Sequence, residues 1–278
     1  DQIMNRVVDF VRSAKGPFFL YYAPYAVHTP IQPLEALVGK YQSKASWNRQ
    51  QNADYASMVE NLDRNIGLLL QALKIKGSLH NTMIVFTSDN GGLFGITYQL
   101  PLRAGKGSYY EGGIRVPFFF VWPDRIQKGR QNETPITNLD LFPTLLDAAG
   151  IDLEQTRFDG QNLLPLLVDN HPLEQRPLFW HFPIYLQAYD VKNNQDRDSL
   201  FRTRPGSVVR FGDWKLHHYF EDDGVELYNI REDISEQNNL ASEHPDKSAE
   251  LYRLLDQWRK QVEAPIPSEP NPEFESEL

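Results

Sequence analysis

The sequence predicts an α/β domain followed by a small α+β subdomain, and three observations carry this prediction. The first half alternates short apolar runs with helical spacing, the order typical of a mostly parallel sheet flanked by helices. After residue 165 the apolar runs shorten, and Gly-Asp or Asp-Gly turn signals separate them as in antiparallel hairpins. A strongly periodic segment near the end then predicts one C-terminal helix.

In the first domain, residues 1–165, the pattern predicts three helices and three strands. The helices cover residues 1–15, 54–76 and 140–149, with apolar residues three or four positions apart. Gly77 and Gly150 follow the last two, and glycine is the residue that best adopts a left-handed helix cap. The strands are short aromatic and aliphatic runs at residues 18–22, 83–87 and 116–121.

The second domain, residues 166–263, is predicted to be a small antiparallel sheet covered by one helix. Its strands are expected at residues 177–181, 207–211, 214–219 and 225–228. Residues 246–262 form the predicted helix, since Leu251, Leu255 and Trp258 recur at helical spacing. Residues 264–278 are rich in proline and glutamate and are predicted to be a mobile tail.

Composition indicates a globular protein and disfavours several functions. Hydrophobic residues make up 41% of the 278 residues, enough for a sizeable core. The formal net charge of −9 disfavours binding to nucleic acid or anionic membrane, which needs a concentrated positive surface. There is no cysteine, which excludes disulfides, thiolate metal sites and thiol catalysis within these residues. No apolar stretch could span a bilayer and no secretion signal is present, so Asp1 is interpreted as a boundary inside a longer protein.

Asp89 and Asn90 directly follow the second predicted strand. A carboxylate and an amide oxygen side by side are hard ligands suited to calcium or magnesium. The two glycines behind them let the backbone turn sharply and approach a ligand. The alternative interpretation is an Asx turn that only ends the strand.

Lys106 and His28 lie in loops at the same predicted edge of the sheet, where ligands of open α/β sheets bind. Lys106, between two glycines, is either a cation that reaches an anionic oxygen or an ordinary surface lysine. His28 either donates a proton to a leaving oxygen or hydrogen-bonds an anion, or else it is structural.

For several other charged residues and histidines, the sequence offers a structural role, alone or as an alternative. Glu111 and Arg115 are predicted to form an ion pair that fixes their loop. His181 either binds substrate or is a core histidine with satisfied ring nitrogens. His217 and His218 are adjacent in a predicted strand, so their side chains point to opposite faces and make a poor shared metal site.

In this order and spacing, the motifs resemble those of the sulfatase family. They are, in chain order, residues 28–30 (HTP), 87–92 (TSDNGG), 105–117 (GKGSYYEGGIRVP), 159–167 (DGQNLLPLL), 212–216 (GDWKL) and 226–230 (ELYNI). The first three resemble the family's substrate histidine, calcium motif and lysine loop. The others resemble its connector between domains and its C-terminal sheet.

The resemblance implies an alkaline-phosphatase-like fold, incomplete here, and hydrolysis of sulfate esters on a sulfated small molecule or glycan. It implies that Asp89 and Asn90 bind Ca²⁺, that Lys106 binds the sulfate, and that His28 contacts it or assists the leaving group. The family's nucleophile is a formylglycine hydrate made from Cys or Ser in a C/S-x-P-S/A-R motif. Calcium and cationic side chains would stabilise charge on the transferring group.

The sequence departs from the family pattern in several respects. It has no cysteine and no Ser-x-Pro-Ser/Ala-Arg, and the family's N-terminal aspartate pair is missing too. We therefore expect this polypeptide alone to be inactive and to bind calcium weakly, because two side chains do not make a full oxygen shell.

Two other functions are open at this point. A phosphoester or phosphonate hydrolase of the same superfamily would share the fold, although no histidine-rich second metal site accompanies Asp89. A non-catalytic sugar-binding protein would use aromatic stacking. The candidate aromatic residues are Trp180, Tyr185, Tyr189 and Tyr219.

Residues 182–205 are the expected source of substrate specificity, since loops of this kind shape pockets. Arg197, Arg202 and Arg204 lie in this stretch and either bind further anionic groups or are surface charges. By analogy with the family, a periplasmic or extracellular bacterial enzyme is expected.

Overall fold

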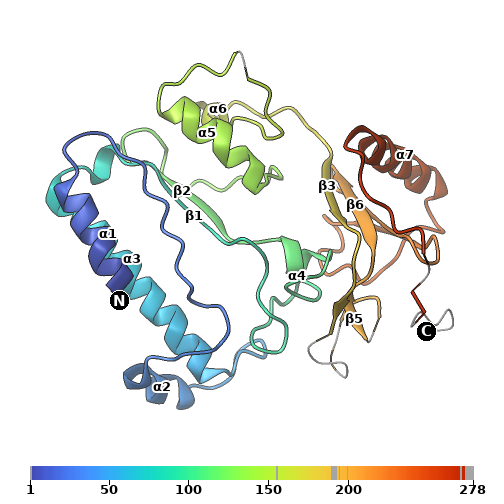
Figure 1. Cartoon of the computed structure of the whole chain (residues 1–278), viewed down its shortest axis with the longest axis horizontal. Helices are drawn as coiled ribbons and strands as arrows, with labels where there is room; N and C mark the ends of the chain where they lie inside the picture. The colour runs from blue at the N-terminus through green and yellow to red at the C-terminus, as the bar shows by residue number, and fades with distance from the viewer. Residues whose placement is uncertain are drawn as a thin grey trace. The chain divides into compact units, whose positions relative to one another are not determined.

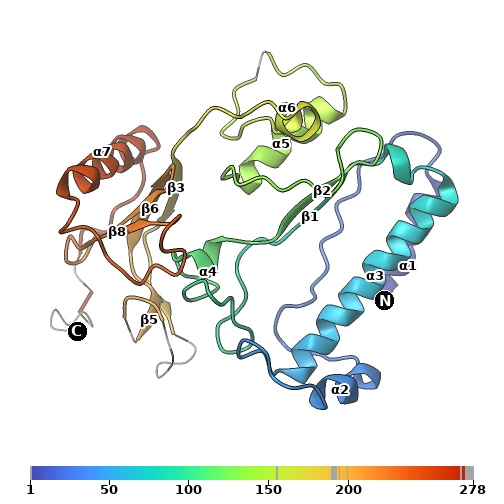
Figure 2. The ribbon, with the colours of Figure 1, turned by 180° about the vertical axis from the view of Figure 1, so that it is seen from behind.

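The computed structural model describes residues 2–154, 156–188, 193, 195–198, 200–269 and 271–272. The chain forms two compact units: unit 1 comprises Asp1–Phe86 and Phe118–Arg130, and unit 2 comprises Thr87–Pro117 and Gln131–Leu278. Figure 1 and Figure 2 show the ribbon from two sides, with labels on many of its helices and strands. No helix in the described ranges is long and apolar enough to cross a membrane.

Unit 1 is built on the long helix α3 (Ala53–Lys76), against which α1 (Gln2–Ser13) and α2 (Glu35–Gln42) pack (Figure 1). Its core includes the buried side chains of Val11 and Leu73. The predicted first helix is confirmed, although it ends two residues earlier than its spacing suggested.

Both ends of α3 are capped by residues that the sequence provides locally. The Asn52 side chain accepts a hydrogen bond from the Tyr55 N–H at the N-terminus. Gly77 adopts a left-handed conformation with φ of 77°, and its N–H bonds to carbonyls of the last turn. The predicted helix and its glycine cap are both confirmed.

Strands β1 (Ile84–Thr87) and β2 (Phe118–Val121) form a two-stranded sheet, and the prediction of a mostly parallel sheet is not confirmed. The strand predicted at residues 18–22 is wrong. This segment does alternate, with Phe18 and Leu20 packed on the helical core and Phe19 exposed. However, no hydrogen bond in the described part joins its backbone to another strand. Alternation alone does not make a strand, because a strand also needs a backbone partner.

The main sheet of unit 2 contains β3 (Leu178–Phe182), β6 (Gly206–Phe211), β7 (Trp214–Tyr219) and β8 (Val225–Asn229) in that order. Every neighbouring pair is antiparallel, as predicted. The hairpin between β6 and β7 turns at Gly212, which has a φ of 61°.

Helix α7 (Pro245–Gln261) packs on β6 and β7 and closes the core of this sheet (Figure 1). Fully buried aliphatic side chains from both layers meet there: Val209, Leu216, Leu227, Leu251 and Leu255. The predicted antiparallel sheet with one packed C-terminal helix is therefore confirmed.

Unit 2 also holds shorter elements. Of these, α5 (Leu141–Ala148), preceded by the 3-10 turn η2 (Asn138–Asp140), was predicted. The sequence did not predict α4 (Glu111–Ile114), α6 (Leu164–Asp169), or the antiparallel pair β4 (Leu186–Gln187) and β5 (Phe201–Thr203). Each of these is too short for its periodicity to be recognised.

Candidate active site

Asp89 and Asn90 lie in the loop that follows β1. Asp89 Oδ1 accepts a hydrogen bond from the Asn90 N–H at 3.0 Å, and Asn90 Nδ2 donates to the Gly91 carbonyl at 2.9 Å. Within the described ranges, Asp89 Oδ2 and Asn90 Oδ1 accept no hydrogen bond from the protein. The motif therefore caps its own turn and still offers one oxygen from each side chain to a cation.

The lysine loop, residues 103–113, is hydrogen-bonded directly to this motif. The Lys106 N–H donates to the Gly92 carbonyl at 2.9 Å, and the Gly91 N–H donates to the Gly113 carbonyl at 2.8 Å. A Cβ atom added to Gly91 would lie 1.8 Å from the Gly112 oxygen. Only glycine permits this approach. Unit 2 thus brings the Asp89–Asn90 loop and the Lys106 loop together.

A buried ion cluster anchors the lysine loop on the antiparallel sheet. Lys215 Nζ lies 3.1 Å from Glu111 Oε1 and 2.9 Å from Glu236 Oε1. Glu236 Oε2 also accepts the Glu111 N–H at 2.6 Å. Arg115 Nη1 lies 3.1 Å from Glu111 Oε2, which confirms the predicted ion pair. Lys215, Glu111 and Glu236 are buried, so each of these charges has its partner inside the protein.

The cluster keeps Glu236 ionised. Burial by itself would raise the pKa of Glu236, but the charge of Lys215 and the hydrogen bond from His217 lower it to about 2. Burial lowers the pKa of His217, whose Nε2 lies 3.3 Å from Glu236 Oε1. At neutral pH the carboxylate is therefore charged and holds the loop.

Arg103 connects the start of the lysine loop to two distant segments. Its Nη1 donates to the Glu236 carbonyl at 2.9 Å, and its Nε donates to the Gln195 carbonyl at 2.7 Å. Its guanidinium lies over the Tyr110 ring, 3.8 Å from the ring centre. The loop is therefore held at both ends by residues that are remote in sequence.

His28 belongs to unit 1. It lies in the histidine segment, residues 17–33, where its N–H donates to the Tyr25 carbonyl at 2.8 Å. Its Nδ1 lies 2.7 Å from the Thr29 carbonyl oxygen. The residue is exposed, and its described contacts are with near neighbours in the chain.

Both ring nitrogens of His181 have partners in the described structure. Its Nδ1 lies 2.8 Å from Ser207 Oγ, and its Nε2 lies 3.0 Å from the Pro265 carbonyl oxygen. Burial lowers its pKa. Because both ring nitrogens already have partners, these contacts do not favour the predicted role in substrate binding.

His217 and His218 point to opposite faces of β7, as their adjacency predicted. His217 contacts Glu236, whereas His218 Nε2 lies 2.6 Å from Asp223 Oδ1. No group of three or more His, Cys, Asp or Glu side chains in the described part could hold a metal.

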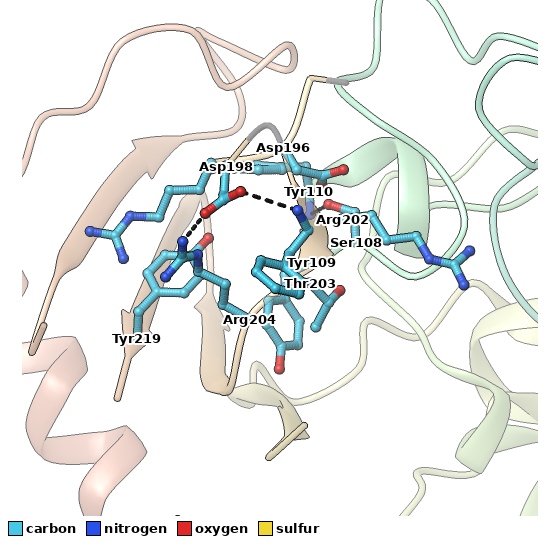
Figure 3. Close-up of a pocket in the computed structure, with 11 residues that line it drawn as sticks. Ser108, Tyr109, Tyr110, Asp196, Asp198, Arg202, Thr203, Arg204 and Tyr219 are labelled. Atoms are coloured by element: carbon cyan, nitrogen blue, oxygen red, sulfur yellow. Dashed lines mark hydrogen bonds and ion pairs between the residues drawn. The ribbon is translucent and has the colours of Figure 1, made fainter. Parts of the chain in front are cut away.

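A pocket opens beside the lysine loop, as Figure 3 shows. Its lining includes Ser108, Tyr109, Tyr110, Asp196, Arg197, Asp198, Arg202, Thr203, Arg204 and Tyr219. Sequence reasoning selected the three arginines but missed Asp196, because no motif distinguishes it from a surface carboxylate. Tyr189, a predicted sugar-stacking residue, lies outside the described residues.

Comparison with known proteins identifies the family of this chain. Residues 1–151 match the family described as Sulfatase, and residues 105–263 match the one described as N-sulphoglucosamine sulphohydrolase, C-terminal. The chain belongs to the sulfatase family. Members of this family are sulfuric ester hydrolases.

This sulfatase chain has similar relatives among both sequences and structures. It is 36% identical over 293 residues to a sulfatase of Formosa agariphila, covering 95% of this chain and 51% of that protein. The crystal structure of Ps i-CgsB in complex with k-i-k-neocarrahexaose has a TM-score of 0.76 and 32% identity, covering 93% of this chain and 54% of that one. A structure in complex with its substrate D-glucosamine-2-N,6-O-disulfate has a TM-score of 0.61 and 27% identity, covering 87% and 47%.

The sulfatase chain spans about half the length of the curated relatives it matches. Its fold neighbours are sulfatases, which supports the alkaline-phosphatase-like fold that the motifs implied.

Proposed function

We propose that this chain is part of an enzyme that hydrolyses sulfate esters on a sulfated carbohydrate. The observation that carries the proposal is the direct hydrogen bonding between the Asp89–Asn90 loop and the Lys106 loop. It brings the backbone of Lys106 next to the turn that carries two hard oxygen ligands, and a cationic side chain together with such ligands is the combination that an anionic ester and a divalent cation require.

Asp89 and Asn90 would give two oxygens to Ca²⁺, and the remaining ligands would come from residues outside these 278. When bound, the ion would supply positive charge next to the sulfate oxygens. Lys106 would bind a sulfate oxygen and stabilise the charge that develops on it. His28 would contact the sulfate or give a proton to the leaving alcohol oxygen.

The nucleophile would also come from outside these residues. The sequence has no cysteine and no Ser-x-Pro-Ser/Ala-Arg, so it provides no precursor of formylglycine. We expect the 278 residues alone to release no sulfate from an ester. We further propose a periplasmic or extracellular site of action, by analogy with the family.

A sulfated sugar is the substrate class that the relatives favour. One similar structure holds a neocarrahexaose, and another holds D-glucosamine-2-N,6-O-disulfate.

The test is turnover by the full-length protein of sulfated sugars, with phosphate monoesters and diesters as comparison substrates. We expect sulfate release that a calcium chelator abolishes and added Ca²⁺ restores. Lys106→Ala should lower kcat/KM for the sulfated sugar by about 10²- to 10³-fold, the usual effect of removing one group that stabilises charge.

The exposed Lys128→Ala is the matched control and should leave the rate unchanged. Preference for phosphate esters would instead favour a phosphoester hydrolase. Sugar binding without any turnover would favour a non-catalytic relative.

A further inference from the structure

Residues 93–102, the connecting segment, join the Asp89–Asn90 loop to the lysine loop within unit 2. Its second half forms a turn, in which the Leu102 N–H donates to the Gln99 carbonyl at 2.9 Å. Gln99 is a residue that no sequence motif distinguishes. Its place in the connecting segment, however, allows one side chain to contact both of the loops that the segment joins.

The Gln99 side chain lies between one glycine of each loop. A Cβ atom added to Gly92 would lie 2.4 Å from Gln99 Nε2, and one added to Gly105 would lie 3.0 Å from Gln99 Oε1. The carboxamide thus occupies the space that a side chain at either glycine would need. Because Gly92 follows Asn90 by two residues and Gly105 directly precedes Lys106, the carboxamide packs beside both candidate groups.

The backbones of the two loops meet beside this carboxamide. The Gly92 carbonyl oxygen accepts the Lys106 N–H at 2.9 Å, and the same oxygen would lie 2.5 Å from a Cβ atom on Gly105. Gln99 therefore packs against the short stretch that this hydrogen bond joins. Protein interiors have little free space, so a change in the volume of one side chain shifts its neighbours. A change in the size of residue 99 should consequently alter the distance between the two loops.

The polar end of the Gln99 side chain does not explain its presence. Its Oε1 atom is buried and has no hydrogen-bond partner within the described ranges. A buried acceptor without a partner destabilises the folded state. The contribution of Gln99 therefore comes from the size and shape of its side chain. A side chain of the same length without an acceptor should be able to replace it.

We propose that Gln99 is a positioning residue, which sets the separation between the Asp89–Asn90 loop and Lys106. With its Oε1 buried, it acts through the two glycines that it contacts and not on the ester itself. The inference deepens the proposed function and rests on it, since it assumes that the two loops act on one ester. A displacement of about 1 Å between groups that act together can lower the rate about a hundredfold.

Two variants of the full-length protein separate the size of residue 99 from its polarity. Gln99→Ala removes the carboxamide. It should lower kcat for the faster substrate of glucosamine 6-sulfate and galactose 4-sulfate by about 10- to 100-fold, with less than about a threefold change in KM. Gln99→Met keeps the length and removes the unpartnered acceptor. It should keep kcat within about twofold of the wild type and raise the temperature of thermal unfolding.

Hydrogen exchange of the Gly91 and Lys106 amides reports on the contact between the loops without any substrate. Both N–H groups donate from one loop to the other, to the Gly113 and Gly92 carbonyls. In Gln99→Ala the exchange of both amides should become about tenfold faster or more, because these hydrogen bonds open more often. In Gln99→Met it should keep the wild-type rates.

Gln161→Ala is the matched control, because Gln161 is also only partly exposed in unit 2 but its side chain donates to the Glu174 carbonyl at 3.0 Å. It should change neither kcat nor the two exchange rates. If Gln99→Ala leaves kcat and exchange unchanged, or if Gln99→Met loses as much activity as Gln99→Ala, the positioning role is overturned while the sulfatase activity stands. A full-length wild-type protein that hydrolyses no sulfate ester would overturn the proposed function. The exchange rates would then still decide whether Gln99 fixes the distance between the two loops.

Discussion

The lysine loop of unit 2 and the histidine segment of unit 1 carry the two predicted catalytic side chains, but they are held in different ways. The lysine loop rests on fully buried charges, with Lys215 between Glu111 and Glu236. In the histidine segment the aromatic side chains of Phe19 and Tyr21 are 71% and 81% exposed.

The two regions differ in the sequence separation of their contacts as well as in burial. The lysine loop is fixed by partners about a hundred residues away, whereas the Nδ1 atom of the exposed His28 lies beside the carbonyl of its neighbour Thr29. Substitutions in the buried cluster that anchors the lysine loop should therefore mainly lower the free energy of unfolding. Substitutions of His28 should lower the catalytic rate alone.

The largest effect is expected when the buried cluster loses its cation. Lys215→Met removes the buried cation between the two carboxylates; Glu111 keeps Arg115 and Arg210, but Glu236 loses its lysine partner inside the protein, which should lower the free energy of unfolding by about 3–5 kcal/mol. Urea unfolding of the full-length protein measures this. The control is Lys40→Met in unit 1, which breaks an exposed ion pair with Glu60 and should have little effect. Equal losses in the two variants would show that burial does not distinguish the two regions.

The same cluster predicts a dependence of stability on pH. The pKa of Glu236 falls from its usual 4.5 to about 2 in the folded protein, so the folded state binds this proton less tightly than the unfolded state. Its stabilisation, about 3 kcal/mol, is complete above pH 4.5 and is lost as the pH falls through 2. Unfolding free energies measured from pH 6 to pH 2 should fall less steeply in Glu236→Gln. If the unfolding free energy of Glu236→Gln falls with pH as steeply as that of the wild type, the pH dependence does not come from Glu236.

A smaller effect, on rate alone, is expected in the histidine segment. His28→Asn should lower kcat of the full-length protein by about a hundredfold, the usual contribution of one general acid, and leave the melting temperature unchanged. His80→Asn is the matched control, because His80 is also an exposed histidine of unit 1. A clear fall in melting temperature in His28→Asn would show that the segment is structural rather than catalytic.

The smallest expected effects compare two glycines. Gly91→Ala places a Cβ atom against the Gly112 carbonyl and should destabilise the full-length protein by about 1–3 kcal/mol. Gly39→Ala, in helix α2 where a Cβ meets nothing within 4 Å, should stabilise it by about 0.5–1 kcal/mol. Thermal unfolding of both variants checks the opposite signs. The same sign for both would mean that the close packing at Gly91 does not determine the effect of an added Cβ atom on stability.

For the candidate active site, the residues that carry chemistry could be selected from the sequence, but the groups around them could not be predicted. Asp89, Asn90 and Lys106 could be selected because short motifs carry their chemistry, and the ion pair of Glu111 with Arg115 spans only four residues. Asp196 could not be selected, because its position near Ser108 depends on how residues 195–198 lie against the lysine loop.

The sequence by itself determined the elements whose signals are local. Helix α3 was predictable together with its Gly77 cap, and the hairpins of β6, β7 and β8 followed from alternation and turn residues, because a few neighbouring residues encode each of these. Only the tertiary structure decided that residues 18–22 lack a strand partner, that His181 is satisfied by Ser207 and Pro265, and that Lys215 joins two carboxylates. These outcomes depend on which distant segments meet, and neither hydrophobic periodicity nor turn chemistry carries that information.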